Sequence, residues 1–262
     1  MKYFSIDLET AGIDWNNDTI LEFGAILEDT NLQRPFETIP KFNVLLRHPK
    51  YTGSPYALAM HTEIFTELAK PAGQSSVRII DFDKLGNEFM KWIIDINKEH
   101  KCVEQENIGQ LPLIINVAGK NFGTFDLRFL ENLEGFKDYI KIRQRIIDPA
   151  VLYFDVDKDL KELPNLSLCK ERAGIKDTSI AHRTIKDAWD IIQVLRGKMY
   201  PKIGEDAKWL DFKELLYTEK EVEKLLETQR GNCYVAILSK TKNEKIAETA
   251  IHTPEPGMWR KK

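Results

Sequence analysis

The segment that most constrains the fold of this chain is its beginning. Over residues 3–9 the side chains alternate with period two, which places two sets on opposite faces of a strand: Phe4, Ile6 and Leu8 on one face, and Ser5, Asp7 and Glu9 on the other. Two further strands, residues 19–27 and 42–46, follow so closely that an antiparallel meander is their simplest arrangement. Residues 3–9 are therefore expected to form a central strand, with Asp7 and Glu9 near its solvent-accessible tip.

The later elements turn this meander into a mixed α/β fold. Apolar residues at helical spacing predict helices over residues 55–69, 82–100, 124–133, 166–173 and 183–195. Between them lie a largely apolar stretch typical of a buried strand, residues 111–117, and a short strand at 145–147. This order predicts a mixed sheet, an antiparallel meander plus parallel strands, with helices packed against it.

Gly197 and Pro201 indicate a domain boundary near residue 200. We expect one domain over residues 1–200 and a small, mainly helical C-terminal extension over residues 201–262. A capping-box pattern at residues 218–221 opens a helix there, residues 234–238 read as a strand, and residues 253–262 as a tail. The extension either packs as an appendage, covers the first domain, joins a homodimer, or contacts a replication or repair partner.

Composition and charge exclude several classes of protein. Hydrophobic residues make up 42% of the 262 residues, enough for a packed core, which excludes an intrinsically disordered chain. A net charge of −3 excludes a polybasic protein that holds nucleic acid by bulk charge, but not an enzyme whose metal ions supply positive charge locally. The absence of an apolar run of ~20 residues, an early acid at Asp7 and three scattered cysteines favour a cytoplasmic protein without a membrane contact.

Acidic residues at the predicted strand tip suggest a metal site. Asp7 and Glu9 lie on one face of the strand, about 6–7 Å apart. Two adjacent carboxylates repel each other, and a hard divalent cation such as Mg²⁺ or Mn²⁺ relieves the repulsion. The spacing alone is a weak signal, because Asp81-x-Asp83 and Asp155-x-Asp157 repeat it.

Two more segments place ionisable residues at the ends of buried elements. Asp126 follows the apolar stretch 111–117 by a short turn and stands at the start of a helix, where ligands gather beyond the ends of sheet strands. His182 and Asp187 are five residues apart, which is not one helix face. We expect His182 on the loop entering the helix and Asp187 on the helix itself, so that one moves protons while the other binds metal.

In this order, Asp7-x-Glu9, then Asp126 in an Asn-x-x-x-Phe-Asp context, then His182-x₄-Asp187 resemble the DEDDh 3′→5′ exonucleases, the family of proofreading polymerase subunits, RNase T and oligoribonuclease. The resemblance covers about residues 1–197 and includes Ile20-Leu-Glu-Phe-Gly-Ala25 and Phe125-Asp-Leu-x-Phe-Leu130. One departure is Ala11, where relatives often have threonine. The tyrosine subclass is disfavoured because position 183, four before Asp187, is arginine.

The resemblance implies an RNase H-like fold and a two-metal hydrolase that releases 5′-mononucleotides from 3′ ends of single-stranded DNA or RNA. It implies Asp7, Glu9, Asp126 and Asp187 as residues that hold or orient two Mg²⁺ or Mn²⁺ ions, and His182 as the general base. Further residues are candidates for substrate contact: Thr10, Met60, His61, Asn121 and Phe122.

Two alternatives remain open at this stage. Within the same enzyme class, the protein could be an exoribonuclease of short oligonucleotides, selected by contacts to the 2′-hydroxyl and by the depth of the pocket. In a different class, it could be a nuclease-like module that binds nucleic acid or a partner without cutting. The five filled catalytic positions disfavour the second alternative.

Overall fold

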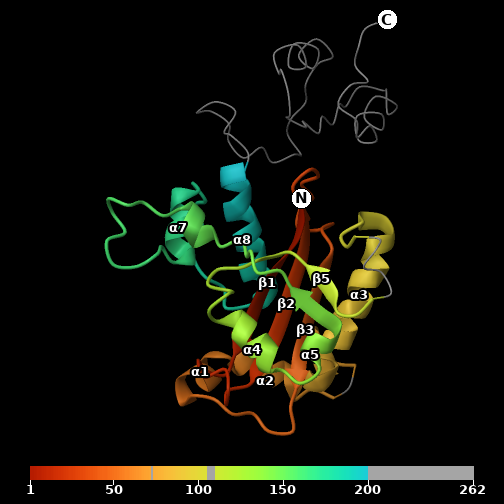
Figure 1. The fold of residues 1–262 in the computed structure, drawn as a ribbon. Coiled ribbons are helices and arrows are strands. Elements are labelled where there is room, and N and C mark those ends of the chain that lie inside the picture. Colours follow the sequence, from red (N-terminus) through yellow and green to blue (C-terminus); the bar gives the residue numbers. More distant parts are fainter. Residues whose placement is uncertain (72, 105–109, 200–262) are drawn as a thin grey trace, which may run out of the picture. The chain divides into compact units, whose positions relative to one another are not determined.

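The centre of the protein is a five-stranded mixed sheet (Figure 1), seen in a computed structural model that describes residues 1–71, 73–104 and 110–199. The strand order is β4-β3-β2-β1-β6. The strands are β1 (Lys2–Thr10), β2 (Ile20–Asp29), β3 (Lys41–Arg47), β4 (Arg78–Asp81) and β6 (Val117–Ala118). Strands β1 to β3 form the antiparallel meander, whereas β6 runs parallel to β1 and β4 parallel to β3. The predicted mixed sheet, an antiparallel meander plus parallel strands with helices packed against it, is confirmed.

Strand β1 lies inside this sheet, between β2 and β6. In the register with β2, Asp7 lies opposite Gly24 and Glu9 opposite Glu22. As the period-two alternation predicts, successive side chains of β1 lie on opposite faces of the sheet. Phe4 and its apolar neighbours pack in the main core, while the hydroxyl of Ser5, on the other face, donates to the carbonyl of Ala188 at 2.8 Å.

Helices cover both faces of the sheet, with α3 and α8 on opposite sides of it (Figure 1). On the main-core side, Phe89 of α3 (Leu85–His100) packs edge-on against Phe4, with ring centroids 5.8 Å apart. On the other side, α8 (Thr184–Met199) packs against Tyr3 and Ile26. The shorter helices are α1 (Pro55–Met60), α2 (Thr62–Leu68), α4 (Asp126–Asn132), α5 (Phe136–Tyr139), α6 (Pro149–Leu152) and α7 (Leu166–Arg172), with a 3₁₀ turn at Phe82–Lys84.

The helix α8 approaches β2 so closely that Gly24 has no room for a side chain. A Cβ at Gly24 would lie 2.4 Å from Oγ1 and 2.9 Å from the backbone carbonyl carbon of Thr184. Thr184 is itself fully buried, and its hydroxyl contacts Asn43 Oδ1 at 3.3 Å. The glycine therefore sets how near the start of α8, and with it Asp187, comes to the sheet.

We expect Gly24→Ala to lower the free energy of unfolding by about 1–3 kcal/mol, because the clash involves backbone and a buried side chain. Gly123→Ala is the matched control, since a Cβ there meets only the terminal methyl of Ile146, at 3.1 Å. Urea denaturation of the two variants measures the difference. Equal stability of both variants would show that α8 moves away from β2 at no cost.

Two predicted elements are each divided in the structure. The helix expected over residues 55–69 is interrupted at His61, which separates α1 from α2. The strand expected over 111–117 is broken at Asn116, whose side-chain amide donates to the carbonyl of Lys2 and whose own carbonyl accepts from Phe4. Its first half, β5 (Leu113–Ile115), instead pairs in parallel with β7 (Ile140–Ile142) to form a second, two-stranded sheet. The largely apolar sequence of residues 111–117 does not indicate that its two halves pair with different strands.

Other short elements also differ from the prediction. The strand expected at residues 145–147 is a single bridge between Ile147 and Ala118. Strands β4 and β7 were not predicted, because segments of three or four residues that include charged side chains show no clear alternation of apolar and polar residues. The helix and strand expected beyond residue 200 lie outside the described residues, and the division at residue 200 stays a prediction. Within the described ranges, no helix combines the length and apolar character that crossing a membrane requires.

Candidate functional site

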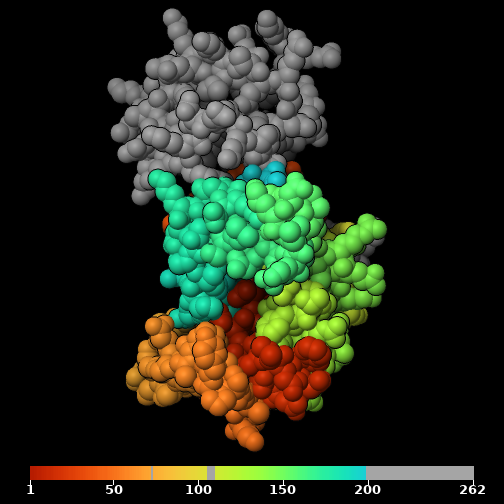
Figure 2. All heavy atoms as spheres, turned by 90° about the vertical axis from the view of Figure 1, so that its left-hand side faces the viewer, coloured from red at the N-terminus to blue at the C-terminus, as the bar shows by residue number. Residues whose placement is uncertain are grey.

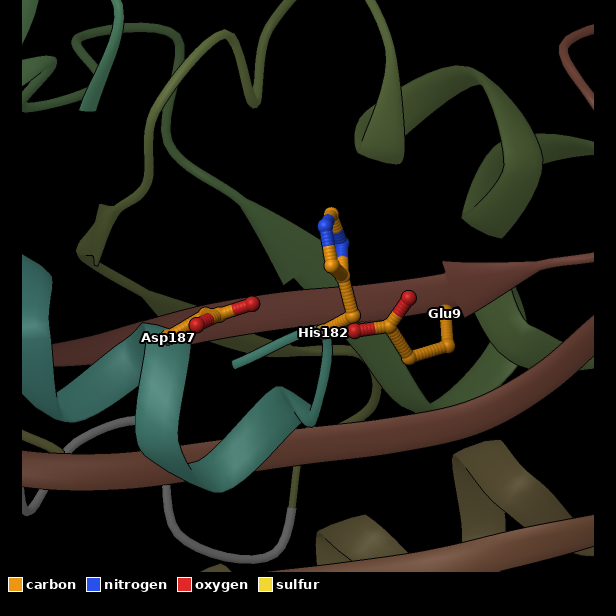
Figure 3. A group of neighbouring side chains, drawn as sticks. All are labelled: Glu9, His182 and Asp187. Atoms are coloured by element: carbon orange, nitrogen blue, oxygen red, sulfur yellow. The ribbon is translucent and has the colours of Figure 1, made fainter. Parts of the chain in front are cut away.

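Three ionisable side chains from opposite ends of the chain converge beside the end of β1 (Figure 3). Glu9, His182 and Asp187 each place one potential ligand atom within 4.8 Å of the others. Glu9 and Asp187 are buried, whereas His182 is exposed. Two buried carboxylates and an imidazole at this separation are a candidate metal-binding group.

Two further carboxylates belong to the same place. Asp126, the first residue of α4, is buried, and its Oδ1 accepts a hydrogen bond of 3.2 Å from the backbone amide of Leu8. This bond fixes the start of α4 against β1, between Asp7 and Glu9. Asp7 is only partly buried by surface area, yet desolvation and then the charges of Asp126, Glu9 and Asp187 raise its pKa well above the ordinary value. The four predicted acidic residues therefore share one electrostatic environment.

The loop before α8 places His182 and Asp187 differently, as the five-residue offset predicted. Asp187 lies in the first turn of α8, and its Oδ1 accepts from the amide of Ala181 at 3.2 Å. His182 has a backbone φ of 50°, in the left-handed region, directly before the helix begins. This turn leaves the imidazole exposed while the carboxylate of Asp187 is buried.

A buried lysine of α7 fixes the loop that precedes α8. Lys170 of α7 is 2% exposed, donates to the carbonyl of Ser179 at 2.8 Å and forms an ion pair of 2.6 Å with Asp190 of α8. The hydroxyl of Ser167, also on α7, donates to the carbonyl of Thr178 at 2.8 Å. The segment that leads to His182 is thus fixed to α7 at two successive carbonyls.

Burial and mutual repulsion make the carboxylates hard to ionise. Desolvation, followed by the charges of Asp187 and Glu22, raises the pKa of Glu9 to about 8. Desolvation raises the pKa of Asp126 to about 7, and it also raises that of Asp187. Four carboxylates with raised pKa values fit a site that divalent cations neutralise, and oxygen donors are those that Mg²⁺ and Mn²⁺ prefer.

These shifts predict how the metal-free protein responds to pH. A carboxyl group whose pKa is raised by folding holds its proton longer in the folded state, so the free energy of unfolding falls as pH rises toward the folded pKa. From pH 6.5 to 8.5 in chelator, we expect the melting temperature to fall by roughly 5 °C. Burial lowers the pKa of His61, which therefore stays neutral in this window.

Glu9→Gln should flatten this pH dependence, because it removes the group whose pKa lies near 8. Asp95→Asn, which changes an exposed carboxylate on α3, is the matched control and should leave the slope as it is. Thermal unfolding at several pH values measures both. A melting temperature of the wild type that rises with pH in chelator would contradict the electrostatic description.

An ion pair between the buried Glu22 and the partly exposed Arg183, next to Glu9, was not predicted from the sequence. Glu22 is fully buried opposite Glu9, and the guanidinium of Arg183 contacts both of its oxygens, at 3.1 and 3.3 Å. The imidazole of His61 lies on the other side of Glu9, with Nε2 3.5 Å from Oε2 of Glu9. The pair could have been suspected from Glu22, the one carboxylate within the otherwise apolar residues 20–27, because a buried charge needs a partner of opposite charge.

The residues predicted to contact substrate differ in their exposure to solvent. Thr10 is buried, and its hydroxyl donates to a backbone carbonyl at 2.7 Å, while His61 contacts Glu9 as described. Met60, at the end of α1, is 43% exposed, and Asn121 is exposed in a left-handed turn. Phe122 is fully buried in the main core, so its side chain offers no surface to a substrate. Its expected role as a contact residue is therefore corrected to a core residue.

The surface is hollowed at this site (Figure 2). The floor of the hollow is formed by β1, in dark red. Its walls are the region of α1 and α2 in orange, the loop after β1 in red, the region around α4 in yellow-green, and the segment that leads to α8 in teal. Segments distant in the sequence thus surround the tip of the central strand.

Comparisons with known proteins give only distant structural similarity. No family model matches the chain, and no curated protein matches its sequence. Similar solved structures include cell-death related nuclease 4, with 16% identity and a TM-score of 0.46 over 74% of this chain and 62% of that chain. E. coli exonuclease I bound to a dT13 oligonucleotide has 14% identity and a TM-score of 0.45, over 75% of this chain and 41% of that chain.

A third similar structure is S. pombe Pop2p in a Mg²⁺- and Mn²⁺-bound form, with 13% identity and a TM-score of 0.46 over 74% of this chain and 81% of that chain. The chain therefore spans less than two thirds of the first two proteins.

Proposed function

We propose that this protein is a DEDDh-type 3′→5′ exonuclease that hydrolyses terminal phosphodiesters of single-stranded nucleic acid to 5′-mononucleotides. The observation that carries the proposal is the convergence of Glu9, His182 and Asp187 within 4.8 Å beside the end of β1. Asp7 and Asp126 interact electrostatically at the same place. Residues 1–200 would form the catalytic domain.

The carboxylates would hold two divalent cations. Glu9 and Asp187, whose ligand atoms lie close together, would hold one ion together with Asp7. Asp7 would also hold the second ion, and Asp126, fixed by the amide of Leu8, would orient waters. When bound, Mg²⁺ or Mn²⁺ would lower the pKa of a coordinated water and neutralise charge on the leaving 3′-oxygen. The acidic site then becomes attractive to a phosphate backbone despite the net charge of −3.

His182 would act as the general base. Its imidazole is exposed, and the loop that carries it is fixed to α7 by Lys170. An exposed, neutral imidazole beside the carboxylates can accept the proton of the attacking water. Asp187 lies in the buried first turn of α8 and is therefore better placed to bind metal than to exchange protons with solvent.

The polarity of cleavage tests this proposal. The wild type should shorten a 5′-labelled single strand stepwise, and a 3′-phosphate should slow it because the terminal 3′-hydroxyl needs a place in the site. A covalently closed single-stranded circle should resist. If the circle is cut as fast as the linear strand, the exonuclease assignment is wrong.

The same assay decides between the remaining alternatives. Parallel series of DNA and RNA strands, from dinucleotides to long chains, distinguish a general exonuclease from an exoribonuclease of short oligonucleotides. Binding of these strands without any hydrolysis in Mg²⁺ or Mn²⁺ would favour the non-cleaving module instead.

A further inference from the structure

The loop that follows β1 forms part of one wall of the hollow (Figure 2), and it carries an exposed aromatic residue. Trp15 is 37% exposed and lies six residues after Glu9. The loop is well ordered by its own hydrogen bonds, since the carboxylate of Asp14 accepts from Asn16 at 3.0 Å and from Asn17 at 2.7 Å. Trp15 is therefore displayed on a defined turn.

Helix α4 forms the other side of this feature. The guanidinium carbon of Arg128 lies 4.8 Å from the centroid of the Trp15 ring. Asn132, one turn further along α4, donates to the carbonyl of Trp15 at 2.9 Å and to Oδ1 of Asn16 at 3.2 Å. In Figure 2 the red loop and the yellow-green region of α4 adjoin each other on one wall of the hollow.

Arg128 supplies a positive charge next to the Trp15 ring. Arg128 is exposed and lies two residues after Asp126. Within the described ranges it contacts the Trp15 ring and no carboxylate is paired with it, so its charge is available to a phosphate. The two hydrogen bonds of Asn132 already attach the loop to α4, so the Trp15–Arg128 contact is not needed as a tether.

The chemistry of the pair matches one kind of ligand. Every nucleobase has a π face that stacks on an aromatic ring, and a nearby guanidinium adds cation–π and phosphate interactions. We propose that Trp15 and Arg128 form a stacking platform for an unpaired base of the single strand whose end enters the catalytic site. This inference rests on the proposed function and adds a substrate contact to it.

Binding without cleavage tests the platform. The full chain carrying Asp7→Asn is titrated, in Mg²⁺, into 5′-labelled single-stranded DNA and RNA, and fluorescence anisotropy gives the affinity. In that background Trp15→Leu should weaken binding about 5- to 100-fold. Trp15→Phe, which keeps a stacking ring, should recover most of the affinity. Phe154→Leu changes another exposed aromatic residue, between α6 and α7, and should have no effect.

The salt dependence of binding measures the contribution of Arg128 separately. Loss of one phosphate contact to a single strand lowers the slope of log affinity against log salt by about 0.7, so Arg128→Gln should show this decrease. Thermal unfolding of each variant separates lost stacking from lost folding. Unchanged affinity in Trp15→Leu overturns the platform alone, whereas a wild type that neither binds nor cuts any strand in Mg²⁺ overturns the proposed function with it.

Discussion

Asp7→Asn is expected to reduce hydrolysis about 10³-fold or more while the fold is retained. Desolvation and then the charges of Asp126, Glu9 and Asp187 raise the pKa of Asp7, so this carboxylate interacts with all three of the other acidic residues. In the proposed site it alone would contact both ions. Neutralising it also removes repulsion, so the variant should melt at a higher temperature than the wild type in chelator.

Asp83→Asn is the matched control for this variant. Asp83 belongs to an Asp-x-Asp segment with the same spacing as Asp7-x-Glu9, but it is exposed next to β4. Its replacement should leave both the rate and the melting temperature unchanged. Measured initial rates and thermal unfolding decide the matter. An Asp7→Asn protein that cleaves at the wild-type rate would contradict the metal-site assignment.

His182→Ala is expected to lower kcat about 10²- to 10⁴-fold, the usual contribution of a general base, with little change in metal affinity. Its exposed position on the loop before α8 is the reason for this split. Asp187→Ala should instead weaken metal binding as well as turnover. The rising limb that a general-base imidazole gives the pH–rate profile should be present in the wild type and lost in His182→Ala.

A matched histidine makes this test specific. His100 lies at the end of α3, next to Lys2 at the opposite end of β1 from Glu9, and His100→Ala should keep both turnover and the rising limb. Titration of the variants with Mn²⁺ measures metal affinity. If His182→Ala loses as much metal affinity as Asp187→Ala, His182 is a metal ligand rather than a general base.

Local sequence pattern was sufficient for the elements that carry the acidic residues. The alternation of residues 3–9 predicted which side chains share each face of β1, because side chains on a strand repeat every two residues. It did not predict that helices bury both faces. The apolar spacing placed Asp126 at a helix start and Asp187 on the body of a later helix. The structure has Asp126 in the first turn of α4 and Asp187 in the first turn of α8.

The features that local pattern missed depend on partners far away in the chain. The Glu22–Arg183 pair joins residues 161 positions apart, and no local periodicity reports such a contact. The break at Asn116 depends on hydrogen bonds with residues at the start of β1. Phe122 was predicted to contact substrate because it lies in a turn near Asp126, and the sequence does not show that its side chain points into the core.

The central claim is that the carboxylates around β1 act only with divalent cations. The most direct measurement follows degradation of a 5′-labelled single strand by the full-length protein in Mg²⁺, in excess chelator, and after Mg²⁺ is restored. We predict a ladder shortening from the 3′ end that stops in chelator and resumes on restoration. Degradation at the same rate in excess chelator would contradict the account.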